Sequence, residues 1–150
     1  MTVLSSQTIR KLKPILDIKE RTEININGIR TTYGLSAAGY DLRLDQDLEI
    51  KSGNCCLASA TELFDMPNNI IGYVHDKSSL ARRFITVQNT VIEPGWKGQL
   101  TLEIINHSEK DINLFRGMGI AQVVFHFLDE ETEQPYDGKY QHQKGVTEAI

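Results

Sequence analysis

The chain has 150 residues and a mass of 17.0 kDa, a size typical of a single domain. Hydrophobic residues make up 40% of it and charged residues 24%, so the chain can form a core and extensive disorder is excluded. The net charge of -4 argues against nucleic acid as the main partner, because proteins that bind duplexes usually carry a basic face. No apolar run approaches the roughly 20 residues of a membrane span, and residues 1–10 lack the hydrophobic region of a signal peptide. We therefore expect a soluble, cytoplasmic protein with no membrane partner.

The first predicted element is a short helix over residues 5–12. Ser5 or Ser6 is a suitable cap, and Pro14 ends the helical pattern. Alternating apolar residues then predict a half-buried strand over residues 42–50. Further strands are predicted at residues 70–74, 86–92, 100–104 and 120–128. Turn signals lie between the predicted strands, at Gly53-Asn54, Pro67-Asn68-Asn69 and Pro94-Gly95.

A second short helix is predicted at residues 78–84, where the two serines can cap it and Leu80, Ala81 and Phe84 can share one face. Many short strands separated by turns indicate an all-β barrel or jelly-roll-like body. We expect one domain over residues 1–150. Its tail, residues 130–150, has too little apolar content to offset its own ordering entropy, so we expect it to order only against a ligand or another subunit.

The sequence offers no metal site that we can recognise. Cys55 and Cys56 are adjacent, which suits neither an ordinary disulfide nor a CxxC clip, so we expect two reduced thiols and a reducing compartment. The segment His107-Ser108-Glu109 fits the His-x-Glu of zinc deaminases, but no cysteine follows position 56 to complete the site. We therefore expect no zinc and no other protein-bound metal.

Two polar clusters precede the predicted strand at residues 100–104. The first covers residues 36–44 and contains Gly39-Tyr40-Asp41. The second covers residues 75–83, where a cation and two hydroxyls stand at a helix start, which favours an anion. This second cluster is a candidate phosphate cradle, and a capped surface helix with solvated cations is the alternative; its members are Lys77, Ser78, Arg82 and Arg83.

The third cluster, residues 89–104, contains two carboxylates. Glu93 precedes a Pro-Gly turn, and Glu103 lies in the middle of a strand. Alternation places the Glu103 side chain on the face opposite Leu102 and Ile104. A carboxylate on such an apolar strand either faces water or is held for proton transfer, in which case burial would raise its pKa.

Together these clusters resemble the trimeric deoxynucleotide-triphosphate family that contains dCTP deaminases and dUTP diphosphatases. The resemblance spans nearly the whole chain. It rests on the helix at residues 5–12 and on the segments Gly39–Leu44, Lys77–Arg82, Ile92–Trp96 with Leu100–Glu103, Gly117-Met118, and Pro135–Gly145.

Two features favour the deaminase branch of this family. Residues after Arg116 do not resemble the arginine-led, glycine-rich ending of dUTPases, whose phenylalanine covers uracil, and they resemble the deaminase ending instead. Glu103 falls where deaminases carry their catalytic glutamate. The resemblance therefore implies zinc-independent deamination of dCTP to dUTP and ammonia. It also implies a distorted β-barrel, dUTPase-like subunit in a homotrimer with shared active sites.

The resemblance further implies residue roles. Glu103 would deprotonate a water held near Ser78 and Arg82, and the hydroxide would attack C4 of cytosine. The tail would order over the site, and Mg²⁺ would bridge phosphate oxygens. Substrate contacts are implied for Lys77, Ser79, Asn89, Glu93, Trp96, Tyr136, Lys139 and Gln143.

Three residues depart from the family pattern. Lys77 replaces the usual arginine, Asn89 replaces a small residue beside the base, and Glu93 replaces the aspartate that activates water in dUTPases. The extra methylene of Glu93 moves its carboxylate by about an ångström, which favours a role in orienting the sugar. Two alternatives stay open: a dUTP diphosphatase or bifunctional enzyme that forms dUMP and pyrophosphate, and a nucleotide-sensing or protein-binding relative without turnover.

Overall fold

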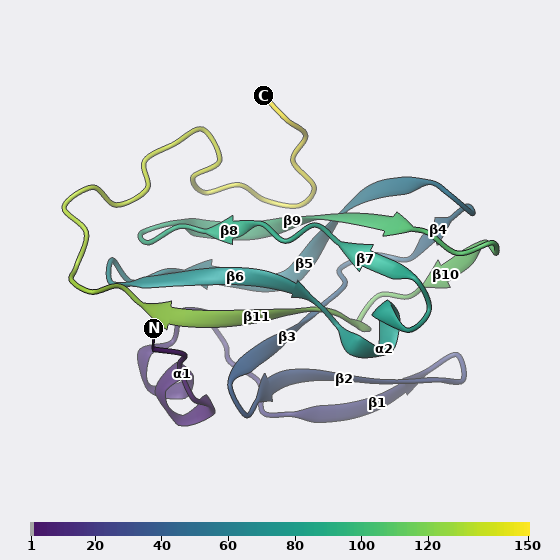
Figure 1. Ribbon diagram of the computed structural model, residues 1–150, viewed down its shortest axis with the longest axis horizontal. Coiled ribbons are helices and arrows are strands. Elements are labelled where there is room, and N and C mark those ends of the chain that lie inside the picture. Colours follow the sequence, from purple (N-terminus) through teal and green to yellow (C-terminus); the bar gives the residue numbers. More distant parts are fainter. Residues whose placement is uncertain (1) are drawn as a thin grey trace.

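The structure is a computed structural model that describes residues 2–150, in which strands and two short helices surround one hydrophobic core (Figure 1). The helices are α1 (Ser6–Leu12) and α2 (Ser78–Ala81). The strands are β1 (Thr22–Ile26), β2 (Ile29–Ser36), β3 (Gly39–Arg43), β4 (Leu48–Ile50), β5 (Cys55–Asp65), β6 (Ile70–Asp76), β7 (Ile85–Val87), β8 (Val91–Ile92), β9 (Lys97–Asn106), β10 (Ile112–Leu114) and β11 (Gly119–Phe127).

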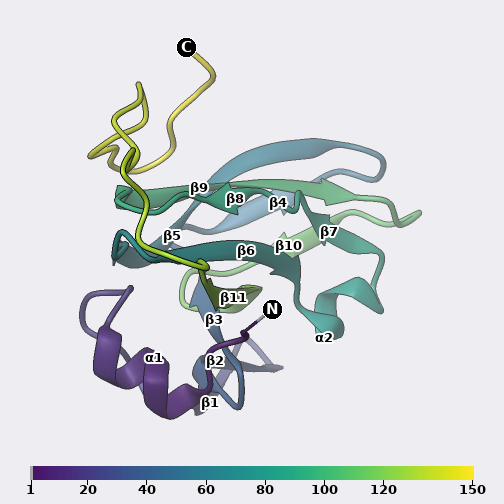
Figure 2. The same ribbon diagram turned by 60° about the vertical axis from the view of Figure 1, so that its left-hand side comes forward.

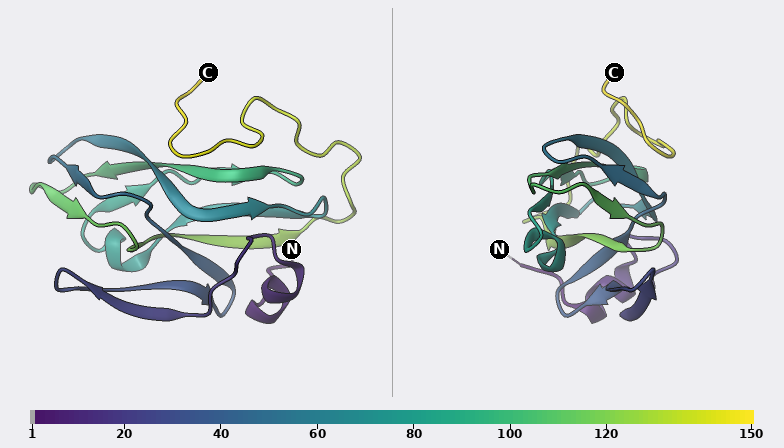
Figure 3. Two further views of the ribbon diagram at one scale, coloured as in Figure 1. Left: turned by 180° about the vertical axis from the view of Figure 1, so that it is seen from behind. Right: turned by 90° about the vertical axis from the view of Figure 1, so that its right-hand side faces the viewer.

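The strands form three antiparallel groups. The largest sheet has the order β1-β2-β3-β11-β6-β8, a second has the order β5-β9-β7, and β10 pairs with β4. Seen end-on in Figure 3, these strands curve around a common interior. That interior contains large apolar side chains from several sheets, among them Tyr40, Phe64, Leu102 and Phe125, each no more than 2% exposed. The predicted all-β fold is confirmed.

Two predicted strands are each divided in the structure. Residues 42–50 belong to β3 and β4, which pair with different neighbours, and residues 86–92 belong to β7 and β8, which lie in different sheets. The apolar alternation continues across the first break, because Leu42, Leu44 and Ile50 all face the core. It shifts across the second break, where Val87 and Ile92 are the buried residues. The prediction of single strands was wrong, since alternation reports which side chains are buried and not which strand they pair with.

The two predicted helices are present, and the second departs from its predicted form. Helix α1 begins after Ser5 and ends at Leu12, and the capping residue Lys13 has a left-handed φ of 50°. Helix α2 is a single turn capped by Lys77, so the serines are its first residues and not its cap. Phe84 is 66% exposed with a φ of 60°, so it does not share the buried face of Leu80. The chain turns sharply at Phe84 to enter β7, and this turn directs the Phe84 side chain toward solvent.

The tail, residues 130–150, contains no helix or strand and runs along the outer side of β8 and β9 (Figures 1 and 2). The tail hydrogen-bonds to β9: the amide of His142 donates to the carbonyl of Lys97 at 2.8 Å, and the amide of Gln99 donates to the carbonyl of Gln143 at 2.9 Å. The composition of the tail predicts that it orders only against a ligand or another subunit. In the structure the tail buries little apolar surface, and it also forms these hydrogen bonds with the body. Within residues 2–150, neither helix is long and apolar enough to cross a membrane.

Candidate active site

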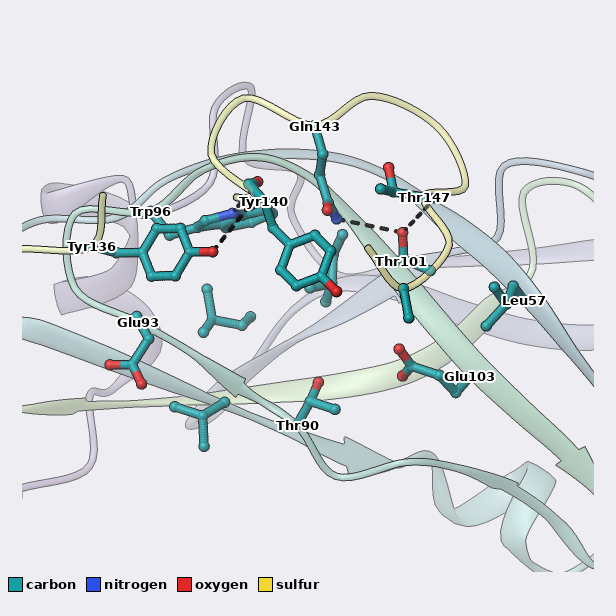
Figure 4. A pocket seen from close by; sticks show the side chains of 14 residues that line it. Leu57, Thr90, Glu93, Trp96, Thr101, Glu103, Tyr136, Tyr140, Gln143 and Thr147 are labelled. Atoms are coloured by element: carbon teal, nitrogen blue, oxygen red, sulfur yellow. Dashed lines mark hydrogen bonds between the residues drawn. The ribbon is translucent and has the colours of Figure 1, made fainter. Parts of the chain in front are cut away.

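The tail, the turn after β8 and the strand β9 enclose a cavity of about 400 Å³ (Figure 4). Its walls are mostly apolar, with a few polar groups among them, which is the usual character of a small-molecule site. The lining residues are Leu57, Thr90, Val91, Ile92, Glu93, Trp96, Leu100, Thr101, Glu103, Tyr136, Tyr140, Gln143, Thr147 and Ala149.

Glu103 lies in the wall of this cavity. It stands on β9 directly opposite Leu57 of β5, and its carboxylate points into the cavity in Figure 4. One carboxylate oxygen, Oε2, is buried and has no hydrogen-bond partner within residues 2–150. Burial raises the pKa of this carboxyl above its ordinary value, because the charged form loses its hydration. Of the two interpretations that the sequence leaves open, the structure favours a carboxylate held inside a site.

Glu93 and Trp96 line the opposite end of the cavity. Glu93 follows β8 and is exposed, so it differs from Glu103 in its access to water. Trp96 is 5% exposed, packs against Phe64 with ring centroids 5.7 Å apart, and donates its indole N–H to the carbonyl of Tyr140 at 2.9 Å. The indole therefore ties the cavity wall to the tail.

The tail supplies the cover of the cavity. The side-chain amide of Gln143 donates to the carbonyl of Gln99 at 2.9 Å, and the Thr147 amide donates to the hydroxyl of Thr101 at 3.0 Å. Tyr136 accepts from the amide of Tyr140 at 3.1 Å through its phenol oxygen. Two predicted tail residues, Tyr136 and Gln143, thus lie beside Glu103, Glu93 and Trp96 in one site.

Other predicted site residues lie outside this cavity. Ser78, Ser79 and Arg82 are exposed on α2 and in the turn that follows it. Lys139 lies on the tail, where its ammonium contacts the carbonyl of Ile150. The cavity within residues 2–150 is lined by two carboxylates and by no lysine, arginine or histidine. A triphosphate therefore finds no cation in the cavity of a single chain.

Asn89 also lies outside the cavity, although Thr90 beside it lines the wall. The side-chain amide of Asn89 lies 3.2 Å from the carbonyl of Val87 and 3.1 Å from that of Val74, and its NH₂ group can donate to both. Asn89 thus links the ends of β6 and β7. Its amide lies where the chain passes from β7 to β8, which belong to different sheets.

Lys77 is held in a nearly buried ion pair. Its ammonium contacts the carboxylate of Asp41 and donates to the hydroxyl of Thr32 at 2.9 Å. The side chains of Lys77 and Asp41 are 11% and 6% exposed. The amide of Gln122 donates to the second oxygen of Asp41 at 3.2 Å. These contacts anchor the start of α2 to the sheet of β3 and β11.

Sequence reasoning missed several lining residues, notably Leu57, Thr90, Thr101 and Tyr140. Leu57 comes from β5, a strand that the sequence analysis did not predict. Tyr140 lies within the Lys-Tyr-Gln segment that carries the resemblance, so its position could have been inferred from Tyr136 and Lys139 around it. Thr90 and Thr101 carried no signal beyond their proximity to Asn89 and Glu103.

A sequence model of the family described as dCTP deaminase-like matches residues 41–128, from Asp41 of β3 to the residue after β11. The chain belongs to this family. The matched region contains α2, β8 and β9, and therefore Glu103, while most of the tail lies outside it.

Individual relatives agree with the family match. The chain is 33% identical over 133 residues to a dUMP-forming dCTP deaminase of Aquifex aeolicus, covering 88% of this chain and 66% of the relative's length. It is 34% identical over 148 residues to a dCTP deaminase of Campylobacter concisus, covering 77% and 80%. The solved 2'-deoxycytidine 5'-triphosphate deaminase of Agrobacterium tumefaciens superposes with a TM-score of 0.63 at 18% identity, over 82% of this chain and 47% of that one. This last likeness supports the fold.

Proposed function

We propose that the protein deaminates dCTP to dUTP and ammonia by hydrolysis, without zinc. One observation carries the proposal: Glu103 is a desolvated carboxylate with an unpartnered oxygen, in the wall of a cavity of suitable size for a base. A base that must accept a proton near pH 7 benefits from a raised pKa. Relatives named dCTP deaminase supply the substrate class.

In this mechanism Glu103 takes a proton from a water molecule as its oxygen attacks C4 of the cytosine. A C4–O bond forms, the electron pair of the C4–N3 double bond moves to N3, and Glu103 passes the first water proton to N3. Glu103 then takes the second proton from the new C4 hydroxyl and delivers it to the exocyclic amine, so that the C4–N bond breaks, the C4=O double bond forms, and ammonia leaves. Each proton that Glu103 accepts is returned, so the enzyme ends unchanged.

The triphosphate requires cations that the cavity of one chain does not supply. We propose a homotrimer in which Ser78, Ser79 and Arg82 of a second copy face the cavity, with Lys139 and Gln143 of the tail closing on the phosphates. Mg²⁺ would arrive on the phosphate oxygens as part of the substrate. Within residues 2–150 there is no group of three or more His, Cys, Asp or Glu side chains able to hold a metal ion.

The roles of the remaining predicted residues follow from their positions. Glu93 is exposed at the far end of the cavity and would orient the sugar, and Trp96 would form the wall beside it. Lys77, already paired with Asp41, would contribute by holding α2 in place. Cys55 and Cys56 are both free thiols, which fits the cytoplasm as the proposed compartment.

A second candidate is the bifunctional reaction, in which dUTP is hydrolysed further to dUMP and pyrophosphate. The dUMP-forming name of the Aquifex aeolicus relative favours it. The reaction would require Glu93 to activate a second water, and its accessible carboxylate lies in the same cavity as Glu103.

Incubation of the purified protein with dCTP, and separately with dUTP, tests the proposal. We expect ammonia and dUTP from dCTP, and no pyrophosphate from dUTP. Pyrophosphate from both substrates would support the bifunctional enzyme, and pyrophosphate from dUTP alone would support a dUTP diphosphatase. Binding of dCTP without any product would contradict catalysis and favour a nucleotide-sensing relative.

A further inference from the structure

The hydroxyl of Thr90 faces the carboxylate of Glu103 across the cavity. Thr90 directly precedes β8, whereas Glu103 lies on β9 in the other sheet, so the two side chains reach the cavity from different walls. In Figure 4 both point into the space between those walls, and no hydrogen bond joins Thr90 to another residue drawn there. A polar molecule placed in that space could contact both groups at once.

The backbone of Thr90 is held firmly enough to position such a molecule. Its carbonyl accepts from the amide of Val74 in β6 at 3.0 Å, and its own amide donates to the carbonyl of Gln88 at 3.0 Å. The neighbouring Asn89 bridges β6 and β7 through its side-chain amide. A hydroxyl on a fixed backbone and a β-branched side chain has few orientations, which suits a positioning role.

Three other hydroxyls around the cavity, those of Thr101, Tyr136 and Tyr140, already accept hydrogen bonds within residues 2–150. The Thr101 oxygen accepts from the amide of Thr147 at 3.0 Å and from the Gln143 side chain at 3.4 Å. The phenol oxygens of Tyr136 and Tyr140 accept from tail amides at 3.1 and 3.4 Å. These three hydroxyls hold the tail over the cavity, whereas the Thr90 hydroxyl makes no hydrogen bond to the tail within residues 2–150.

We propose that Thr90 positions the water molecule that attacks the base, an inference that rests on the proposed deamination. Water has two hydrogens: one donates to the unpartnered Oε2 of Glu103, and the other donates to the hydroxyl oxygen of Thr90. One lone pair of the water is then directed at C4 of the cytosine, and the other is left for a donor such as Arg82 of a second copy. The proton passes to Glu103 as the C4–O bond forms, and Thr90 neither gains nor loses one.

The test compares Thr90→Val, which keeps the shape but removes the hydroxyl, with Thr90→Ser, which keeps the hydroxyl. Ammonia release is measured over a range of dCTP concentrations. We expect Thr90→Val to lower kcat by about 10- to 100-fold, because one hydrogen bond that orients the attacking water is lost, with KM within about threefold. Thr90→Ser should recover kcat to within about threefold. Thr22→Val, on the edge strand β1 far from the cavity, should match the wild type.

The outcomes separate this inference from the proposed function. Wild-type turnover together with unchanged kcat in Thr90→Val would refute the role of Thr90 and leave deamination intact. Equal losses in Thr90→Val and Thr90→Ser would also refute it, because the hydroxyl alone would then not account for the effect. Absence of ammonia from the wild type would overturn both the proposed function and the role of Thr90.

Discussion

Replacement of Glu103 by glutamine tests the site through stability as well as through activity. The substitution keeps the length and shape of the side chain and removes its charge. In the folded protein the carboxylate is half-buried, and its Oε2 atom has no partner within residues 2–150. A charge in such a place opposes folding, because it loses hydration without gaining a hydrogen bond. We therefore expect Glu103→Gln to be more stable than the wild type at pH 8.

The size of the gain follows from the burial of one oxygen. An unsatisfied buried polar group costs about 1–3 kcal/mol and more when it is charged, and glutamine removes only the part due to the charge. Because Glu103 keeps some access to water, we expect this part to be about 1 kcal/mol. For a chain of this length, that corresponds to an increase in Tm of about 2–4 °C. Because folding raises the pKa of Glu103, the unfavourable term is present when the carboxyl is ionised and is lost as the pH falls. The gain in Tm should therefore disappear below the ordinary pKa of glutamate.

The assays are thermal unfolding at pH 8 and pH 4, ammonia release from dCTP, and nucleotide binding followed by the fluorescence of Trp96, the single tryptophan of the chain. We expect Glu103→Gln to lose ammonia release by at least about 10²-fold while binding dCTP within about tenfold of the wild type. A variant that still deaminates dCTP would refute the role of Glu103 as the base. An equal gain in Tm at both pH values would refute its desolvation as the cause.

Three further predictions concern the tail and the buried ion pair. Deletion of residues 133–150 should raise the KM for dCTP at least about tenfold while the body keeps a cooperative thermal transition, and loss of that transition would contradict the prediction. Lys77→Met should lower stability by about 3 kcal/mol, because it leaves the carboxylate of Asp41 buried without its cation, and the double variant with Asp41→Leu should recover part of the loss. A raised KM with unchanged unfolding would instead mean that Lys77 binds phosphate directly. Gln99→Ala removes the side-chain oxygen that accepts a tail amide at 2.7 Å, so limited proteolysis should cut the tail faster than in the wild type.

Much of the fold follows from local patterns in the sequence, and one pattern was overlooked. Alternating apolar residues correctly predicted β9, and the short segment at residues 70–74 and the apolar run at residues 120–128 correctly predicted β6 and β11. The hairpin of β1 and β2 was missed, although Asn27-Gly28 between them is a strong turn signal. Asn27 and Gly28 have φ values of 50° and 81°, and Ile26 pairs with Ile29 across them, as a two-residue hairpin turn requires. Many residues of these two strands are polar, so their sequence resembles that of a loop.

The sequence by itself determined the β character of the chain and the family to which it belongs, and it predicted Glu103 as the catalytic carboxylate. These depend on residue type, short spacing and the order of motifs, which the chain carries without folding. Only the tertiary structure decided which groups share a site. It placed Thr90 and the tail beside Glu103, paired Lys77 with Asp41, and left Arg82 outside the cavity. These placements depend on which distant strands pair and on which partner each charged group contacts. Neither can be predicted from short stretches of sequence.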